Sequence, residues 1–438
     1  MHAKLDGTSM MPEDLFNFVI GLGVLSFLIF GMVLRSRRPK TPIWSIMAFS
    51  AFVIVISGLT PIESIAHVMD FDVILFLIGM FSIVAVAESS GLLDSIAHLV
   101  LSRFKGTYTM LIFLSLTMGL LSSIAVNDTV ALMGPPIVYS IAKSMGINPK
   151  PLFLLLAFSI TIGSTTTPIG NPQNMLIAIN SGMKCPFIDF VKYLSIPTII
   201  NLIVTALIVA KVYKLNGAFL GSLNKVRSHI NNIRDALVAS VLLIAVIVFL
   251  VVNDVMALLG LPHIENRGFI PFMVAAGGYL LVSNPRDVLR RVDWGTIVFF
   301  MTMFITMSGV WRSGVLNSLL SLFMPSKNTW PFDYFGITAC SLVLSQLLSN
   351  VPFTKLFLDY MKTLGYTPSD VNSWITLAMA STIAGNLTLL GAASNIIIIE
   401  VLESRYGETI SFKEFSKIGM IVTLVNIAVY TIFILLLT

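Results

Sequence analysis

The residues best placed to do chemistry are polar groups that interrupt long apolar stretches of the sequence. Asn127 and Asp128 interrupt the apolar stretch 107–145, and Asn350 interrupts the stretch 332–363. A carboxylate at the centre of a membrane costs about 2.5–3.5 kcal/mol on insertion scales, and an ionisable residue there is by default a functional group. If the first stretch lies in a membrane, Asp128 is a candidate proton carrier or cation ligand. The alternative is a helix-terminal charge with no further role.

The two asparagines stand where a second helix would begin after each interruption, and Asn is a good N-cap residue. A helix that begins at membrane depth directs its unpaired N–H groups and the positive end of its dipole into the surrounding cavity. An anion would be bound there without a formal positive charge. Lys355 is a second charge in these stretches. It either pairs with Asp128 or attracts an anionic substrate, or it extends to the surface and pairs with Asp359.

Two further apolar stretches, 150–182 and 372–402, are interrupted by dense runs of Gly, Pro, Ser, Thr and Asn. Such runs end a helix, which predicts two half-helices joined by an unwound loop in each stretch. Carbonyl and side-chain oxygens of unwound loops coordinate a hard cation such as Na⁺. The candidate substrate-binding clusters are Ser123, Thr167, Gly170 and Asn171 in the first half, and Ser349, Thr388, Gly391 and Ser394 in the second, each completed by its asparagine. The candidate sodium ligands are Asn127, Gly170, Asn350 and Gly391. For any single Ser or Thr, the alternative is an ordinary hydrogen bond between helices.

The composition indicates the setting in which these residues lie. The chain has 438 residues, of which 56% are hydrophobic and 11% are charged. A soluble domain carries about 25% charged residues, so a water-soluble enzyme is excluded. The repeated apolar runs predict one all-α polytopic membrane protein. The net charge of +5 then belongs to cytoplasmic loops and does not indicate nucleic acid.

The residues of enzymes and metalloproteins are not grouped in this sequence. Two cysteines are too few for a disulfide framework or a thiolate cluster, and the five histidines fall in loops or near span ends. There is no nucleophile-elbow or phosphate-loop pattern. We therefore predict that the protein is not an enzyme and carries no cofactor, apart from Na⁺ or H⁺ as a coupling ion.

The positions of Lys and Arg predict the topology of the chain. The basic residues at 35–40 place the first connecting loop in the cytoplasm, so both termini are expected outside. Residues 91–105 are expected to form an amphipathic helix at the interface. The predicted spans are 12–34, 43–60, 72–90, 193–214, 234–254, 268–283, 294–311 and 417–437, with broken spans at 150–182 and 372–402 and re-entrant hairpins at 107–145 and 332–363.

The two halves of the chain can be aligned with one another. Thr167, Gly170 and Asn174 match Thr388, Gly391 and Asn395 at identical spacing. This predicts a first repeat at 12–214, a basic cytoplasmic connector at 215–233 and a second repeat at 234–438. Each half has five expected crossings and one hairpin, and because five is odd the second repeat is inverted. Inverted repeats with discontinuous helices are typical of secondary transporters, whose site lies at the repeat interface near the midplane. A channel that kept a relic duplication is the rival interpretation.

These motifs resemble those of the ArsB/NhaD ion-transporter superfamily, which includes the divalent-anion/sodium symporters. The resemblance covers about residues 12–438. Its most specific parts are Val126-Asn127-Asp128, Ser349-Asn350-Val351-Pro352, the run from Thr167 to Pro172, and Gly385-Asn386-Leu387-Thr388 with Gly391. The Asn-Asp tip looks most like the arsenite permease branch. The dicarboxylate branch carries Ser-Asn-Thr at both tips, whereas here only the second tip keeps Ser-Asn.

The resemblance implies a scaffold domain, a transport domain that holds both hairpins, elevator-like motion and a homodimer. We predict an ion-coupled secondary active transporter of a small anion or oxyanion, with arsenite-type efflux as the leading specific hypothesis. Asp128, Asn127, Asn350 and Lys355 are the candidate ion-coupling residues. The alternatives are a Na⁺/H⁺ antiporter and a sodium-coupled dicarboxylate symporter. The expected location is the inner or plasma membrane, with lipid and a small substrate as partners and no nucleic acid.

Overall fold

The computed structural model describes most of the chain, and these residues fold almost entirely into helices. The described residues are 12–37, 42–93, 95–96, 106–215, 230–315, 320–321, 324, 326–327 and 331–436. They form two compact units. The first comprises Met1–Asp70 and Val298–Ser326, and the second comprises Phe71–Ile297 and Lys327–Thr438. Each unit draws on both halves of the sequence, so the units are a different division of the chain from the predicted repeats.

The first unit is built from α1 (Pro12–Arg37), α2 (Ile43–Ile56), the short η1 (Ile62–Ser64) and α3 (Ile65–Val68), and most of α14 (Trp294–Arg312). Its helices pack closely because small residues lie at their contacts. A Cβ added at Gly309 would lie 2.3 Å from a methyl carbon of Ile54 on α2. The hydroxyl of Thr306 also donates to the Met47 carbonyl over 3.4 Å. Small residues and hydroxyl groups at such contacts are typical of helices that pack within a membrane.

The second unit contains the predicted hairpins and broken helices. Its helices are α4 (Phe71–Ser89), α6 (Thr107–Ala125), α7 (Asn127–Met145), α8 (Lys150–Ser164), α9 (Pro172–Asn180), α10 (Pro186–Val212), α11 (Ile233–Leu258), α12 (Phe269–Tyr279), α13 (Pro285–Arg291), α16 (Phe332–Leu348), α17 (Asn350–Thr363), α18 (Val371–Ile383), η3 (Ala384–Asn386), η4 (Leu389–Gly391), α19 (Ala393–Tyr406) and α20 (Phe412–Leu436).

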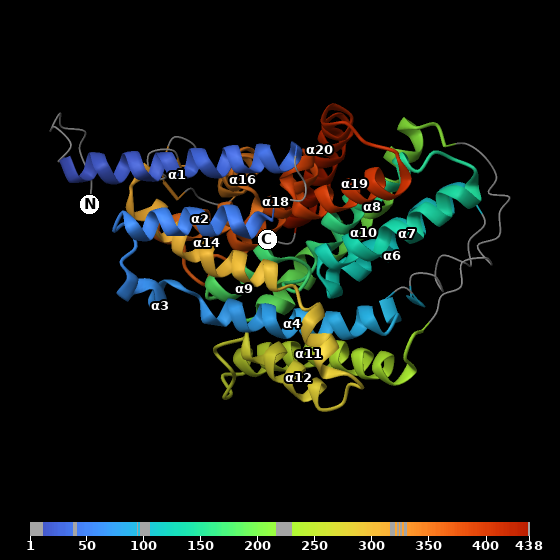
Figure 1. Ribbon diagram of the computed structural model, residues 1–438, viewed down its shortest axis with the longest axis horizontal. Helices are drawn as coiled ribbons and strands as arrows, with labels where there is room; N and C mark the ends of the chain where they lie inside the picture. The colour runs from blue at the N-terminus through green and yellow to red at the C-terminus, as the bar shows by residue number, and fades with distance from the viewer. Residues whose placement is uncertain are drawn as a thin grey trace. The chain divides into compact units, whose positions relative to one another are not determined.

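Two groups of helices can be distinguished within this unit by their packing. The outer group consists of α4, α11, α12 and α13, and in Figure 1 α11 and α12 lie along α4. The hairpin group consists of α6–α10 and α16–α20, which pack mainly on one another. The second arm of each hairpin packs on a broken helix of the other half: α7 on α19, and α17 on α9. Contacts of α4 with α9 and of α10 with α11 join the two groups.

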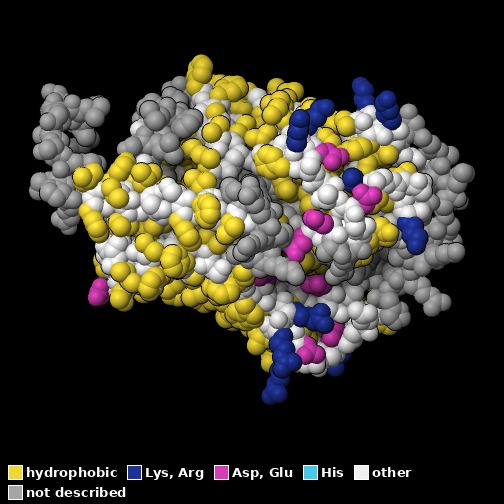
Figure 2. All heavy atoms as spheres, turned by 45° about the horizontal axis from the view of Figure 1, so that its top comes forward, with side chains coloured by type: hydrophobic (Ala, Val, Ile, Leu, Met, Phe, Trp, Pro, Cys, Tyr) yellow, Lys and Arg dark blue, Asp and Glu magenta, His cyan; other side chains and the backbone are white. Residues whose placement is uncertain are grey.

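The helices are suited to a membrane. Among the described residues, seven helices are long and apolar enough to cross a bilayer. Hydrophobic side chains cover much of the face drawn in Figure 2, and on α11 exposed side chains include Leu237, Val241 and Ile244. Such a surface would aggregate in water but is solvated by lipid tails. The prediction of an all-α polytopic membrane protein is confirmed.

The predicted helix breaks are confirmed, with small differences in the bounds. α6 and α7 are separated only by Val126, and α16 and α17 only by Ser349. α10 begins at Pro186, not at 193, because Pro at the first helical position and Asp189 in the first turn favour a helix start there. The interfacial helix expected at 91–105 and the connector 215–233 lie largely outside the described residues. The inverted orientation of the second repeat stays a prediction.

Candidate functional site

Both hairpin tips turn through a residue with a positive φ angle that is not glycine. Val126 has φ 61° and ψ 134°, and Ser349 has φ 68° and ψ 156°. Residues held in such a conformation cost about 1–3 kcal/mol each, and they persist only where the surroundings fix them. For the β-branched Val126 the conformation is especially unusual. Strained backbone at the same position of both hairpins marks the tips as functional candidates.

The two tip asparagines begin the second arm of each hairpin, but not as N-caps. Asn127 and Asn350 are the first helical residues, and the N-cap positions belong to Val126 and Ser349, neither of which makes a side-chain cap bond. The expectation that the asparagines cap these helices is therefore wrong, because the positive φ of the preceding residue already turns the chain. Their side chains are 6% and 4% exposed, and neither Oδ1 atom has a hydrogen-bond partner in the described part of the chain.

The first hairpin tip is bound to the first unwound loop. The hydroxyl of Thr167 donates a hydrogen bond to the Ser123 carbonyl. The Asn127 amide donates to the Gly170 carbonyl over 2.9 Å. The structure thus brings four of the predicted first-half residues together, and all four are buried. The carbonyl of Gly170 is already engaged by this bond.

The remaining predicted residue of the first cluster, Asn171, has a structural role. It is the N-cap of α9, and its Oδ1 accepts from the Asn174 amide over 2.9 Å. Its Nδ2 donates to Ser164 and, over 3.2 Å, to the hydroxyl of Thr382 from the other half of the chain. The Thr382 hydroxyl in turn donates to Asn174 Oδ1 over 3.1 Å. Asn174 Nδ2 lies within 3.1–3.2 Å of three loop carbonyl oxygens, those of Ser164, Thr165 and Thr167. The first loop is therefore closed by hydrogen bonds of its own residues together with Thr382 from the other half.

The second unwound loop is held in a similar way but less completely. Asn395 Nδ2 donates to the Gly385 carbonyl over 2.8 Å. The Thr388 hydroxyl donates to Gln346 Oε1 over 2.7 Å, which ties this loop to the first arm of the second hairpin. A Cβ added at Gly385 would lie 2.9 Å from the Nδ2 atom of Asn350, so the loop also touches the second tip. Tip and loop therefore form one local structure in the second half as well.

Several buried polar atoms of the second loop have no hydrogen-bond partner among the described residues. They are Oδ1 and Nδ2 of Asn386, Oγ of Ser394 and Oδ1 of Asn395. All three side chains are 0% exposed. A buried polar group without a partner costs about 1–3 kcal/mol, so a group of them in one loop calls for a ligand, an ion or a water molecule that would satisfy them. Oxygen atoms that accept hydrogen bonds dominate this set, as they do at the tips.

The two charged candidates lie in the second arms of the hairpins. Asp128 is half-buried in the first turn of α7. Lys355 forms an ion pair with Asp359 one turn along α17, with Nζ and Oδ2 2.9 Å apart. The sequence left this pairing with Asp359 open as one of the interactions that Lys355 could make. Among the described residues there is no group of three His, Cys, Asp or Glu side chains that could hold a metal ion, so a bound cation would rest mainly on neutral oxygens.

The clusters predicted from the sequence contain the tips and parts of the loops but leave out four residues that complete them, although Asn386 and Asn395 stand in the motifs quoted above. Thr382 closes the first loop, Gln346 holds the second, and Asn386 and Asn395 carry unpartnered oxygens. One available signal was the repeat itself. Thr382 stands at the same offset from Thr161 as Thr388 does from Thr167, which would have included it among the matched residues.

Comparison with known proteins identifies the family of this chain. Residues 27–384 match the family model described as citrate transporter. The chain belongs to this citrate transporter family. The family is part of the ArsB/NhaD superfamily, so the resemblance read from the tip and loop motifs is confirmed. As a member of this family, the protein is a multi-pass membrane transporter.

The curated relatives are also transporters. An uncharacterized transporter of Mycobacterium tuberculosis is 28% identical over 379 residues, which cover 83% of this chain and 86% of that protein. A putative transporter arsB of Dictyostelium discoideum is 25% identical over 483 residues, covering 86% and 84%. The silicon efflux transporter LSI3 of Oryza sativa is 26% identical over 367 residues, covering 72% and 75%.

Solved structures share the fold at low sequence identity. The YdaH transporter of Alcanivorax borkumensis has a TM-score of 0.51 and is 12% identical, with 85% of this chain and 86% of that chain covered. MtrF of Neisseria gonorrhoeae has a TM-score of 0.55 at 12% identity, with 83% and 80% covered. At this identity the likeness concerns the fold alone.

Proposed function

We propose that this protein is an ion-coupled secondary active transporter of a small oxyanion or its protonated acid, with arsenite-type efflux as the leading specific hypothesis. The transported molecule and the coupling ion would bind between the hairpin tips and the unwound loops. Binding at membrane depth by discontinuous helices is typical of secondary transporters. A location in the cell membrane follows from the same proposal.

The observation that carries the proposal is the pair of tip asparagines. Asn127 and Asn350 follow strained residues, are almost fully buried, and each has a side-chain oxygen without a partner in the described chain. Natural proteins seldom keep buried polar atoms unpaired unless a ligand, ion or water uses them. A transporter that binds and releases its ligand in every cycle has a reason to keep them.

The chemistry of the unpartnered atoms favours a ligand that donates hydrogen bonds or carries positive charge. Four of them are amide oxygens, on Asn127, Asn350, Asn386 and Asn395, and amide oxygens accept. A Na⁺ ion or the hydroxyl groups of a weak oxyacid would satisfy them, whereas a fully ionised anion alone would not. The relative named as a silicon efflux transporter supports a small oxyacid. Asp128 remains our proposed site of protonation or cation binding, and Lys355 remains a proposed modulator of coupling.

The decisive experiment is flux into proteoliposomes containing the purified protein. Arsenite, silicic acid, citrate and ²²Na⁺ would be tested with and without a pH gradient. We expect arsenite or silicic acid flux that requires an imposed Na⁺ or H⁺ gradient. Flux of Na⁺ against H⁺ without any oxyacid would instead support the antiporter alternative, and flux of citrate alone would support the symporter alternative.

Variants test whether the tips form the site. Asn127→Ala and Asn350→Ala should each lower flux at least tenfold, while the protein stays folded. Asn372→Ala is a matched control, because Asn372 is also a first-turn asparagine with a buried unpartnered Oδ1, but at the start of α18 away from the tips and loops. Normal flux in both tip variants would contradict the proposed site. Lys355→Gln should change substrate affinity or ion coupling.

The elevator motion and the homodimer are proposals that depend on the same function. The hairpin group would be the moving part, since it contains both tips and both unwound loops. Cross-linking across the dimer and the mass of the protein in detergent would test the oligomeric state.

A further inference from the structure

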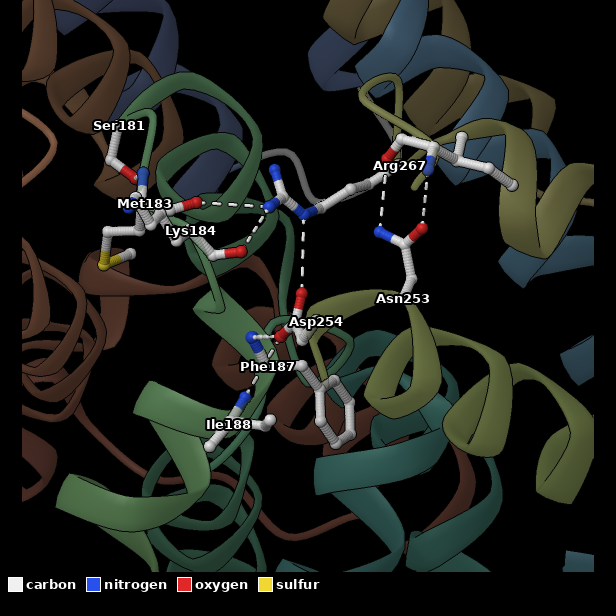
Figure 3. Close-up of polar contacts among 9 residues, drawn as sticks. Ser181, Met183, Lys184, Phe187, Ile188, Asn253, Asp254 and Arg267 are labelled. Atoms are coloured by element: carbon white, nitrogen blue, oxygen red, sulfur yellow. Dashed lines mark hydrogen bonds and ion pairs between the residues drawn. The ribbon is translucent and has the colours of Figure 1, made fainter. Parts of the chain in front are cut away.

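A buried ionic cluster lies where the outer group meets the hairpin group (Figure 3). Asp254, near the end of α11, is 1% exposed, and its Oδ2 accepts hydrogen bonds from the amides of Phe187 over 2.8 Å and Ile188 over 3.3 Å. These amides belong to the first turn of α10. A carboxylate at this position satisfies unpaired N–H groups and the positive end of the α10 dipole. The outer group thus caps a helix of the hairpin group.

Arg267 completes the cluster from the loop that joins α11 to α12. Its Nε lies 3.6 Å from Asp254 Oδ1. Its Nη2 donates to the carbonyl oxygens of Met183 over 3.2 Å and Lys184 over 2.8 Å. These carbonyls follow directly after α9, whose first turn is capped by Asn171 in the first unwound loop. Arg267 therefore binds the short connection between α9, the half-helix that begins at the candidate site, and α10.

The residues that present Asp254 and Arg267 are firmly attached to the outer group. Asn253 exchanges two hydrogen bonds with Ile264, over 3.1 and 2.8 Å, which fixes the α11–α12 loop against α11. The next residue after Arg267 donates its amide to Asp72 of α4 over 2.6 Å. A Cβ added at Gly268 would lie 1.9 Å from the Asp72 carbonyl oxygen, so loop and helix are in direct contact. In this cluster, two side chains that are fixed to the outer group contact two backbone segments of the hairpin group. These segments are the first turn of α10 and residues 183–184.

The ion pair in this cluster is suited to holding an arrangement that can be released. Arg267 Nε makes no hydrogen bond within the described part of the chain, and the ion pair is long. Desolvation offsets most of the attraction in a buried pair, so such a pair adds little net stability, whereas a single unpaired buried charge is strongly unfavourable. The pair therefore selects one arrangement of the two groups more than it stabilises the fold.

We propose that Asp254 and Arg267 form a clamp that holds α9 and α10 against the outer group and opens when the hairpin group moves during transport. This rests on the proposed function, because only a transporter with a moving hairpin group needs to release the contact. Opening would separate Asp254 from the first turn of α10 and Arg267 from the two carbonyls beyond α9. It would thereby free both the start of α10 and the connection between α9 and α10 at once.

A thiol at position 183, whose carbonyl Arg267 binds, reports whether the contact is closed. Met183 is 1% exposed, so Met183→Cys should react slowly with a water-soluble maleimide in the purified protein. The background carries Cys185→Ser and Cys340→Ser to remove the two native thiols. Adding Asp254→Asn with Arg267→Gln removes both charges together and so avoids an unpaired buried charge. We expect labelling at least tenfold faster in this variant, with an unchanged melting temperature.

The matched control removes an ion pair that lies within the hairpin group. The Nζ atom of Lys150 lies 3.1 Å from Oε2 of Glu408, and the two side chains are 29% and 36% exposed. Lys150→Met with Glu408→Gln should leave the labelling of the thiol at position 183 unchanged. Equal labelling in the clamp variant and its background would overturn the proposal that these two residues hold the contact.

A second variant tests whether the clamp opens during transport. Lys184→Cys with Arg267→Cys is made together with Asp254→Asn, so that no buried charge is left unpaired, in the background without the two native thiols. Joining the two thiols by a short bis-maleimide should abolish arsenite and silicic acid flux, while the unlinked variant keeps it. Full flux in the cross-linked protein would overturn opening. The labelling arm needs no substrate. If the wild-type protein transports none of the tested compounds, the proposed function fails, and with it the opening during transport, while the labelling result still decides whether the clamp holds the contact.

Discussion

The two unwound loops have matching sequences but differ in how completely their polar atoms are paired. In the first loop Asn174 binds three carbonyl oxygens through Nδ2 and receives the Thr382 hydroxyl at Oδ1. In the second loop Asn395 Nδ2 binds Gly385 in the same way, but its Oδ1 has no partner within the described residues. The first loop is complete without a ligand, whereas the second retains atoms for one. The comparison indicates that the second half contributes more to binding and the first half more to structure.

The difference in pairing between the two loops follows the hydrogen bond that one threonine hydroxyl makes in each half. Thr161 and Thr382 occupy equivalent places in the two broken helices, yet only Thr382 donates across to the loop of the other half. The Thr161 hydroxyl donates to Ala157 in its own helix over 3.1 Å. Its methyl carbon lies close to Gly385, where a Cβ would approach it to 3.5 Å. Threonine in a helix has both options available, so the sequence alone does not distinguish them.

The largest expected effect comes from adding a methyl group to the matched glycines. A Cβ at Gly170 would lie 2.2 Å from the Ser164 carbonyl oxygen, and one at Gly391 would lie 2.8 Å from the Gly385 carbonyl oxygen. We expect Gly170→Ala to cost more than about 3 kcal/mol and Gly391→Ala about 1–3 kcal/mol, because the closed loop has less room to adjust. Thermal unfolding in detergent measures both. Equal losses would contradict the view that the first loop is the tighter one.

The paired threonines test the closing hydrogen bond directly. Thr382→Val leaves Asn174 Oδ1 buried without its donor, so we expect a loss of about 1–3 kcal/mol. Thr161→Val removes only a bond within its own helix, and we expect a change within about 0.5 kcal/mol. The difference in melting temperature between the two variants is the measurement. A larger loss in Thr161→Val would reverse the comparison.

Substitution of Asn386 in the second loop is expected to affect transport without lowering the stability of the protein. Both polar atoms of this fully buried side chain lack partners in the described chain, so Asn386→Leu should leave stability unchanged or raise it by about 1 kcal/mol. If the side chain binds the transported ligand, the same variant should lower proteoliposome flux at least tenfold. Asn174→Leu is the control from the closed loop and should destabilise the protein instead. Unchanged flux in Asn386→Leu would remove this residue from the site.

The smallest expected effect concerns the start of α18, the helix that leads into the second loop. Partial burial raises the pKa of Asp370, but hydrogen bonds from Lys327 and Thr367 outweigh it and hold the pKa below its ordinary value. A carboxyl whose pKa is lower in the folded than in the unfolded state stabilises the fold at pH values above its unfolded-state pKa of about 3.9. This stability is lost as the pH falls through the folded-state pKa. Lys327→Met should therefore cost about 0.5 kcal/mol at neutral pH and nothing in strong acid. Melting temperatures against pH would show the two curves converging as the pH falls; a constant gap would contradict this role.

The positions of the helices and of their breaks could be predicted from the residue pattern alone. Long apolar runs have few solutions in a membrane, and the polar runs at the tips and loops end a helix there. Pro alone does not decide this, since Pro135 and Pro136 lie inside α7. The breaks at Val126 and Ser349 and the ends at Ser164 and Ile383 are accordingly those the residue pattern predicts. The repeat was visible for the same reason, because equal spacing of glycine and asparagine is a property of the sequence.

The pairing of the buried polar atoms could not be predicted from the residue pattern and is seen only in the folded chain. Thr382 reaches Asn174 and Arg267 reaches the carbonyl of Met183 across more than eighty residues of chain. Such bonds depend on which helices become neighbours and on the rotamer each side chain then adopts, and neither is encoded by local propensity. Because helix neighbours and rotamers differ between the two halves, matching sequence patterns give a closed loop in one half and a loop with unpaired oxygens in the other.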